Sequence, residues 1–304
     1  MKDIEKDISV EEKFIQSITT SDSTSQVSIS CQIDKSFQQI TASVQKFGEI
    51  NKYRKSDTDI TETYQYKVVR SLVVHCFLVI GWCSPYSNNT VRVLKSDGSK
   101  DFEIKTIGQA FDVVFIGNNS IAVTSCDSNQ INIIDLKRHK LKKSIKVDSD
   151  NYGVVYKDGH LIYCAGEKGL QMISLKDETI TNVSNTKLPS FAYITIFGDK
   201  LFYTNFYDDS VTCCDYHGNI LWTFYDKSVL VSPFGISVDN DCNVFVVGYS
   251  TNNVVVISPD GQRYRQLLSR ENGLIGPKAL HYDTSTNELL VANESDEAFL
   301  YDVK

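Results

Sequence analysis

A repeat of about 40–44 residues in the second half of the chain constrains the fold more than any other feature. Pro189, Pro233 and Pro277 follow one another at steps of 44 residues. A short apolar segment recurs in the same register, with its five copies at 121–125, 161–165, 201–205, 245–249 and 289–293. Repeats of this length that contain several short strands are typical of β-propellers. The repeat therefore predicts an all-β chain rather than a helical or α/β one.

Each unit of the repeat has the same internal order. An inner strand is predicted at 112–116, 153–156, 192–197, 235–239 and 279–282. A turn of Gly, Asn or Asp follows, residues that tolerate positive φ, and the apolar segment then forms the second strand. Third strands are predicted at 131–136, 170–175, 211–215, 254–258 and 298–302, and fourth strands at sites such as 141–147, 220–224 and 264–268. Four strands joined in this way predict one antiparallel blade.

One further unit precedes these and is less regular. Residues 90–94 and 102–104 match a third and a fourth strand, so the first two strands should lie within 66–87. That segment is a nearly continuous apolar run without a polar turn, and an error in the sequence is one hypothesis for the lost pattern. One irregular and five clear units predict a six-bladed β-propeller, since the residues from 60 to 304 then give about 41 per blade.

The two ends of the chain are expected to differ from the repeat. The last unit stops after its third strand, and Val44–Ile50 is the predicted outer strand that completes it and removes an exposed sheet edge. Residues 41–304 are thus predicted to form the propeller, closed by an N-terminal strand. Residues 1–40 are predicted to be a short helical segment and linker. The helical pattern fits either the end of a longer coiled-coil helix or a simple surface helix.

The sequence around the fourth clear unit resembles a known repeat. Ser232–Asp239, followed by Cys242–Val247, resembles the NHL repeat, although Cys242 stands where a glycine is usual. The chain as a whole resembles the C-terminal propeller of tripartite-motif proteins, in which a RING, B-boxes and a coiled coil come first. The resemblance implies a substrate-recognition propeller of a ubiquitin ligase, with oligomerisation through an upstream coiled coil if the protein is longer. The sequence holds no Cys/His-rich RING or B-box, so a non-catalytic protein–protein interaction module is expected.

Composition sets limits on partners and location. The net charge of −7 makes the chain a poor general partner for phosphate backbones, so nucleic-acid binding is possible but disfavoured. The eight cysteines form no CxxC pair, and no histidine lies at zinc-finger spacing from them. They are expected to be reduced, as in a cytoplasmic protein. The longest apolar stretch, 72–83, is too short to span a bilayer.

The loops between second and third strands should lie on one face of the ring, and this face is the predicted partner-binding site. Phe206 and Tyr207 are the most suggestive residues, because aromatic side chains are enriched in binding hot spots. The alternative is that both pack on a neighbouring blade. The full set of predicted partner-binding residues is Asp127, Asn129, Glu167, Lys168, Phe206, Tyr207, Asp208, Tyr249, Asn252 and Glu294.

Two other functions stay open. An RNA-binding propeller would use the basic run of Lys137, Arg138, Lys140, Lys142 and Lys143, although no aromatic residue is interleaved there for base stacking. A metal-dependent propeller hydrolase would need several carboxylates at the starts of the inner strands. Those positions are aromatic, at Phe111, Tyr152, Phe191 and Phe234, where wedge packing between blades is expected, and Asp112 is the one acid. The sequence therefore predicts no catalytic residue, metal site or cofactor.

Overall fold

The computed structural model describes residues 66–71, 76–81, 89–95, 100–294 and 298–303. The chain divides into two compact units, Met1–Ile40 and Thr41–Lys304, and every described residue belongs to the second. The predicted helical segment within 1–40 and the predicted closing strand Val44–Ile50 lie outside the described residues. Within the described part, no helix is long and apolar enough to cross a membrane.

The described residues form 23 β-strands in six antiparallel sheets, with two short 3₁₀ turns at Gly166–Lys168 and Arg270–Asn272. Within each sheet the strands follow chain order. The sheets are β1 (Tyr66–Ser71), β2 (Cys76–Gly81), β3 (Thr90–Lys95) and β4 (Lys100–Lys105); β5 (Ala110–Gly117), β6 (Ser120–Ser125), β7 (Gln130–Asp135) and β8 (Lys140–Lys146); β9 (Val154–Lys157), β10 (His160–Cys164), β11 (Leu170–Ser174) and β12 (Ile180–Ser184); β13 (Ile194–Phe197), β14 (Lys200–Asn205), β15 (Ser210–Asp215) and β16 (Ile220–Tyr225); β17 (Pro233–Val238), β18 (Val244–Gly248), β19 (Asn253–Ile257) and β20 (Tyr264–Leu268); and β21 (Pro277–Asp283), β22 (Glu288–Asn293) and β23 (Ala298–Asp302).

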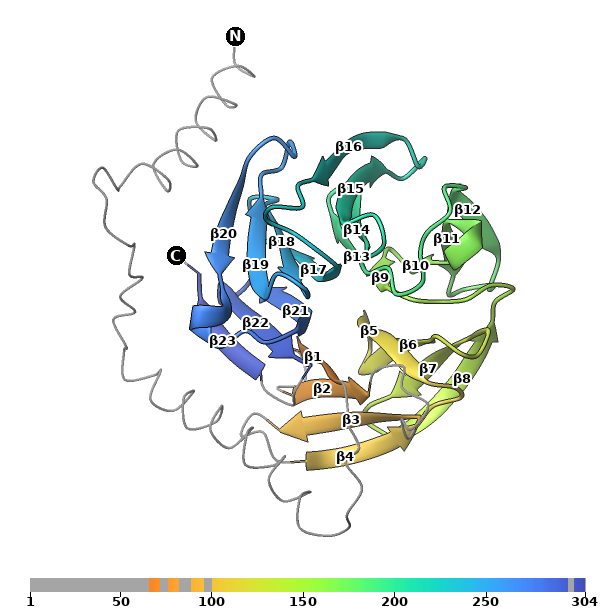
Figure 1. Ribbon diagram of the computed structural model, residues 1–304. Helices are drawn as coiled ribbons and strands as arrows, with labels where there is room; N and C mark the ends of the chain where they lie inside the picture. The colour runs from red at the N-terminus through yellow and green to blue at the C-terminus, as the bar shows by residue number, and fades with distance from the viewer. Residues whose placement is uncertain (1–65, 72–75, 82–88, 96–99, 295–297, 304) are drawn as a thin grey trace, which may run out of the picture. The chain divides into compact units, whose positions relative to one another are not determined.

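These sheets lie one after another around a common centre, with the first strand of each innermost (Figure 1). Each inner strand contacts the inner strand of the next sheet, in the order β1, β5, β9, β13, β17 and β21, and β21 contacts β1 again. The ring of sheets is therefore closed through its inner strands. The prediction of an all-β propeller is confirmed.

The number of complete blades differs from the prediction. Five of the sheets have the four strands of a complete blade, whereas the sheet of β21 to β23 has three. Six complete blades were expected because Val44–Ile50 was assigned to the last one, and no strand among the described residues pairs with the outer edge of β23.

The irregular segment 66–87 does contribute strands to the ring. β1 pairs with β2 in an unbroken antiparallel register from Tyr66 opposite Gly81 to Ser71 opposite Cys76. β2 then pairs with β3, as in every other sheet. The irregular apolar sequence therefore forms the first two strands of a normal sheet, and the fold gives no support to a sequence error there.

The inner strands of neighbouring sheets approach closely where glycine replaces a side chain. A Cβ atom on Gly235 would lie 2.7 Å from the backbone nitrogen of Leu280, and one on Gly153 would lie 2.7 Å from that of Ile194. Real Cβ atoms do not come so near to backbone atoms, so both positions require glycine. The second strands β18 and β22 bury their side chains along their whole length and supply apolar layers between the sheets.

The cysteines do not all follow the prediction. Cys164, Cys213, Cys214 and Cys242 are free and buried, and burial raises the pKa of each thiol. They act as small core residues rather than reactive groups. Cys126 is disulfide-bonded, so the expectation of a fully reduced chain is wrong at this residue.

Candidate functional site

One end of the ring gathers the loops between second and third strands and the connections between sheets. We call it the loop face and define it by residues 106–109, 126–129, 147–153, 165–169, 185–193, 206–209, 226–232, 249–252 and 269–276. Backbone hydrogen bonds join the loops between second and third strands to the connections between sheets. The Cys126 N–H donates to the Gln109 carbonyl (3.1 Å), and the Leu188 N–H donates to the Gly166 carbonyl (3.0 Å). The loop face is thus held by its own backbone contacts.

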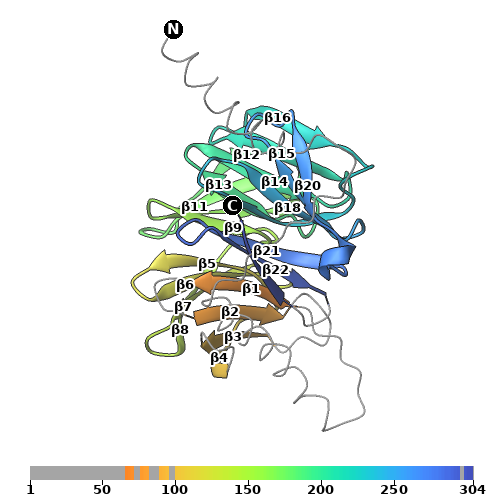
Figure 2. The ribbon, with the colours of Figure 1, turned by 90° about the vertical axis from the view of Figure 1, so that its left-hand side faces the viewer.

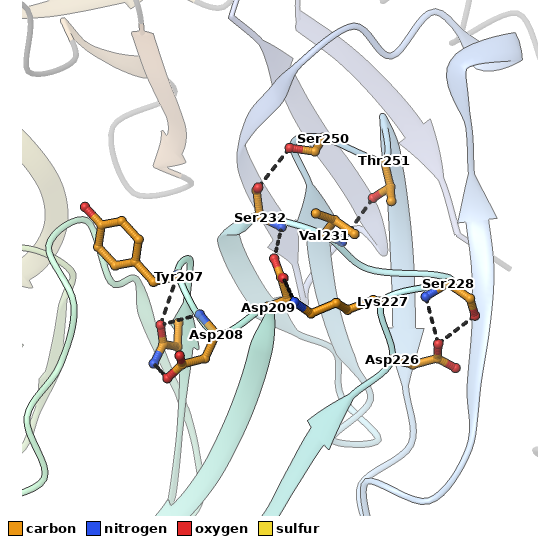
Figure 3. Close-up of polar contacts among 11 residues, drawn as sticks. Tyr207, Asp208, Asp209, Asp226, Lys227, Ser228, Val231, Ser232, Ser250 and Thr251 are labelled. Atoms are coloured by element: carbon orange, nitrogen blue, oxygen red, sulfur yellow. Dashed lines mark hydrogen bonds and ion pairs between the residues drawn. The ribbon is translucent and has the colours of Figure 1, made fainter.

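The loop 206–209 is strongly anchored within this face (Figure 3). The side-chain oxygen of Asn205 accepts hydrogen bonds from the backbone N–H groups of Tyr207 and Asp208, both at 3.1 Å, and its amide donates to the Asp208 carboxylate at 2.6 Å. This is the arrangement by which asparagine stabilises a turn. The sequence Asn205-Phe206-Tyr207-Asp208 therefore fixes the backbone that carries the two aromatic residues.

The base of the same loop is tied to the next sheet. Asp209 is buried, and its carboxylate accepts a hydrogen bond from the Ser232 N–H at 2.8 Å and lies 3.1 Å from the Lys227 ammonium group. The Ser232 and Ser250 hydroxyls lie 2.8 Å apart (Figure 3). The loop 206–209 is thus bound at its base to the connection and the loop of the neighbouring sheet.

Phe206 and Tyr207 have opposite environments. Phe206 is half-buried and packs on Phe234, with ring centroids 4.9 Å apart. Tyr207 is 64% exposed and meets the Phe206 ring edge-on at 5.3 Å. Each of the two interpretations that the sequence left open applies to one residue. Phe206 packs on a neighbouring blade, and Tyr207 projects from the loop face.

A row of aromatic rings lies beneath the loop face. Phe111 contacts Tyr152 and Tyr193 at centroid distances of 5.3 and 4.9 Å, and Phe234 contacts Tyr193 and Tyr249 at 6.3 and 5.5 Å. These distances are those of favourable aromatic pairs. The aromatic residues at the starts of the inner strands therefore pack between sheets, as predicted.

Tyr152 links this row to the exposed surface. Burial raises the pKa of Tyr152, and the nearby Asp150 and Tyr207 raise it further, while its hydrogen bond with Ser190 lowers it. Phe191, which packs on Tyr152 at 5.7 Å, has a φ of 66°, a left-handed conformation that is rare for a bulky residue. Three segments of the loop face therefore meet around one phenol group.

A second polar cluster joins the last two sheets. Lys278 is buried, and its ammonium group lies 2.6 Å from Glu294 Oε1 and 5.0 Å from the centre of the Tyr249 ring. The Tyr249 hydroxyl donates to Glu294 Oε2 at 2.6 Å, which raises the pKa of Tyr249 to about 12. Burial lowers the pKa of Lys278, against the opposing effect of Glu294. Lys278 was not among the predicted site residues, because nothing in the sequence pattern joins it to Tyr249 and Glu294.

The other predicted loop residues occupy the loop face in different ways. Asp127 is exposed and accepts from the Gln109 N–H at 2.6 Å, and the Asn252 side chain accepts from the Gly276 N–H at 2.7 Å. Glu167 and Lys168 are exposed and form ion pairs with Lys187 and Asp148, respectively. Asn129 is exposed, and its carbonyl accepts from the Val147 N–H.

The predicted basic run lies at the other end of the ring. The turn between β7 and β8 is bonded to the turn between β5 and β6, through the Leu136 N–H and the Asn119 carbonyl at 2.8 Å. Arg138 lies 3.6 Å from Asp135, and Lys143 lies 2.6 Å from Glu178. Lys137, Lys140 and Lys142 are exposed. The five cations thus do not form one continuous unpaired patch.

Asp112, the acid at the start of an inner strand, is almost fully buried at 1% exposure. One carboxylate oxygen accepts from the Val113 N–H at 2.6 Å and the other from the Val154 N–H at 3.0 Å, so Asp112 joins β5 to β9. Across the part of the chain that the structure describes, no group of three or more His, Cys, Asp or Glu residues is placed to hold a metal ion.

Comparisons with known proteins bear on the fold. No family model matches the sequence, and a search of curated proteins finds no match. A streptogramin B lyase is 16% identical, with a TM-score of 0.59 over 81% of this chain and 85% of the lyase. A virginiamycin B lyase from Staphylococcus aureus is 17% identical, with a TM-score of 0.58 over 80% of this chain and 85% of that one. The Cps50 (Swd1) β-propeller domain from Myceliophteria thermophila is 9% identical, with a TM-score of 0.58 over 82% of this chain and 99% of that one. At these identities the likeness shows a shared propeller fold.

Proposed function

We propose that this chain is a non-catalytic protein-recognition module that binds its partner through the loop face, with Tyr207 at the centre of the contact. The observation that carries the proposal is the 64% exposure of Tyr207 on a loop whose backbone Asn205 holds in place. A tyrosine that is already ordered loses little conformational entropy on binding, and tyrosines of this kind are enriched in binding hot spots.

The charges around Tyr207 indicate the chemistry of the partner. Asp127, Asp150 and Asp208 are exposed on the loop face, and none of them forms an ion pair with a described residue. A partner segment that presents lysine or arginine would gain electrostatic steering from these carboxylates. The proposed partner is therefore a protein with a basic segment at the contact.

The resemblance to NHL repeats extends the proposal. In this extended proposal, the ring is a six-bladed NHL-like propeller whose last blade is completed by Val44–Ile50. The propeller serves as the substrate-recognition part of a tripartite-motif ubiquitin ligase in the cytoplasm. What supports this is the Pro233-Phe234-Gly235-Ile236 sequence and its position at the start of β17. The RNA-binding alternative has less support, because Arg138 and Lys143 are paired with acidic residues.

Affinity capture with matched variants tests the proposal. The wild-type chain, Tyr207→Ala and Phe197→Ala are immobilised, and bound proteins from a cell extract are compared by quantitative mass spectrometry. Phe197 is the control, because it is an exposed aromatic residue (37%) at the end of β13, where the turn to β14 lies at the opposite end of the sheet from the loop face. We expect a partner that Phe197→Ala retains and Tyr207→Ala loses, and the affinity of the purified partner should fall at least about tenfold, as for a hot-spot residue. Equal binding to all three proteins would reject the loop face as the site.

A further inference from the structure

The outer strand β16 differs from the other outer strands of the ring. β4, β8 and β20 carry charged residues, and the exposed residues of β12, Thr181 and Asn182, are polar. β16, Ile-Leu-Trp-Thr-Phe-Tyr, carries no charge. Its residues Ile220, Leu221 and Tyr225 are 55, 50 and 58% exposed. Natural edge strands are protected from pairing by charge, proline, short length or bulges, and β16 has a bulge opposite Cys213 and Cys214 but no charge.

The free edge of β16 is well positioned for pairing. β16 pairs with β15, and no other strand among the described residues lies along its outer edge. It lies at the outer rim of the ring in Figures 1 and 2. One side of the strand is fixed to the next sheet, since Trp222 Nε1 donates to the Pro259 carbonyl at 3.0 Å and the Phe224 ring contacts Tyr264 at 5.3 Å. Leu221, Thr223 and Tyr225 alternate with these residues and are exposed.

We propose that β16 pairs edge to edge with β16 of a second copy of this chain, in an antiparallel register about a two-fold axis. With Thr223 opposite its own equivalent, Leu221 of each copy faces Tyr225 of the other. Aliphatic–aromatic pairs and threonine pairs are favourable across antiparallel strands. A two-fold interface places the same strand against itself, so it requires a strand that does not repel its own copy.

The charge pattern selects a second copy as the occupant. Self-pairing of β8 would bring four lysines against four lysines, whereas β16 brings no like charges together. A six-residue strand buries a small area, so the complex is a weak, concentration-dependent dimer. Dimerisation through β16 does not depend on partner binding at the loop face, because the two sites share no residue. Sedimentation measures the oligomeric state alone.

Sedimentation analysis of the full chain over a range of concentrations tests the dimer. Thr223→Lys places two lysines opposite each other at the axis and should raise the dimer dissociation constant at least about tenfold. The control is Thr181→Lys, the same change at an exposed position of β12, which should leave the constant unchanged. Circular dichroism confirms that both variants are folded. If the wild-type chain stays monomeric up to about 1 mM, where even very weak complexes begin to form, the proposal is overturned.

Cysteine cross-linking tests the register. Directly opposite residues in antiparallel strands have Cα atoms about 4.5–5.5 Å apart, within the range of a disulfide. Thr223→Cys should therefore form a covalent dimer under mild oxidation, with a disulfide between the two introduced thiols identified by peptide mapping, and Thr181→Cys should not. Efficient cross-linking of Leu221→Cys to itself but not of Thr223→Cys would show a different register and overturn the proposed one.

Discussion

Lys278 shows how single residues connect the last two sheets. It lies on β21, its partner Glu294 follows β22, and Tyr249 comes from the loop after β18. A buried ammonium group is stable only when it is paired with an opposite charge and hydrogen-bonded. Here the Glu294 carboxylate supplies the ion pair and the hydrogen bond, and the Tyr249 ring adds a cation–π contact. Replacing one member therefore leaves the others poorly compensated.

Lys278→Met should lower the free energy of unfolding by about 1–3 kcal/mol, because Glu294 loses its cation in a partly buried site. Urea denaturation of the whole chain measures the change. The double variant Lys278→Met/Glu294→Gln removes both charges and should recover part of the loss. A single variant as stable as the wild type would mean that the pair contributes no net stability.

Tyr249 gives a pH-dependent prediction. Its pKa is raised to about 12, from an ordinary value of 10.0, chiefly by the hydrogen bond to Glu294. A raised pKa contributes stability that is fully present below pH 10 and is lost as pH rises toward 12. The wild type should exceed Tyr249→Phe by about 1 kcal/mol at about pH 8, after allowance for solvent screening, and the difference should vanish between about pH 10 and 12. A difference that does not change with pH would show that Glu294 does not hold the phenol in its protonated form.

At the scale of the element, the apolar second strands were predicted from the sequence almost to the residue. The predicted segment 201–205 forms β14, Lys200–Asn205, because the buried second strands are continuous apolar runs. Inner strands were predicted less well: 235–239 was expected, and β17 begins at Pro233. Proline is compatible with the first position of a strand, although in a sequence it usually indicates a break.

The candidate site was only partly predictable for a physical reason. The loops that lie on one face follow from the alternation of strands and turns, so Tyr207 and Asp208 could be placed there. Contacts between sheets, such as Tyr152 with Ser190 or Lys278 with Glu294, depend on how the sheets turn around the ring. The local pattern of one unit holds no information about that geometry.

Gly235 gives a prediction for the contact between β17 and β21. Gly235→Ala places a Cβ atom against backbone atoms of β21 that cannot move aside, and it should lower the free energy of unfolding by about 1–3 kcal/mol through overpacking. Thermal or urea denaturation measures the loss. Gly198→Ala serves as the control: a Cβ there meets nothing within 4 Å, and its φ of 59° costs only about 1 kcal/mol. An unchanged free energy of unfolding for Gly235→Ala would show that β17 and β21 can move apart.

At the scale of the whole molecule, the sheet of β21 to β23 is the one that has three strands among the described residues. β19, the third strand of its sheet, is buried along its whole length, whereas β23 in the same position is half-buried to exposed. A fourth strand would cover β23 as it covers β19. The sequence prediction that Val44–Ile50 supplies this strand is consistent with the exposure of β23.

Deleting residues 40–52 should therefore lower the melting temperature of the ring. A loss of about 1 kcal/mol corresponds to roughly 2–4 °C in a domain of this size, and loss of a whole strand should exceed that. Calorimetry on the deleted chain measures the shift. Deletion of residues 8–20, which has the same length, is the control. Unchanged melting after removal of 40–52 would mean that another segment, or none, covers β23.

The contact between β21 and β1 has a consequence for how the chain can be cut. Because the first and last sheets are in contact, the ring is closed, and no sheet is first or last in space. Only the order of the sequence makes β1 the first strand and β23 the last. New termini could be opened in the exposed turn at 176–179 between β11 and β12, with the old ends joined by a flexible linker. Such a circular permutant would keep the contacts between the inner strands of neighbouring sheets, while the cut lies at Glu178, the partner of Lys143. Its cooperativity of unfolding would reveal whether the ring melts as one unit or opens first at the sheet of β21 to β23.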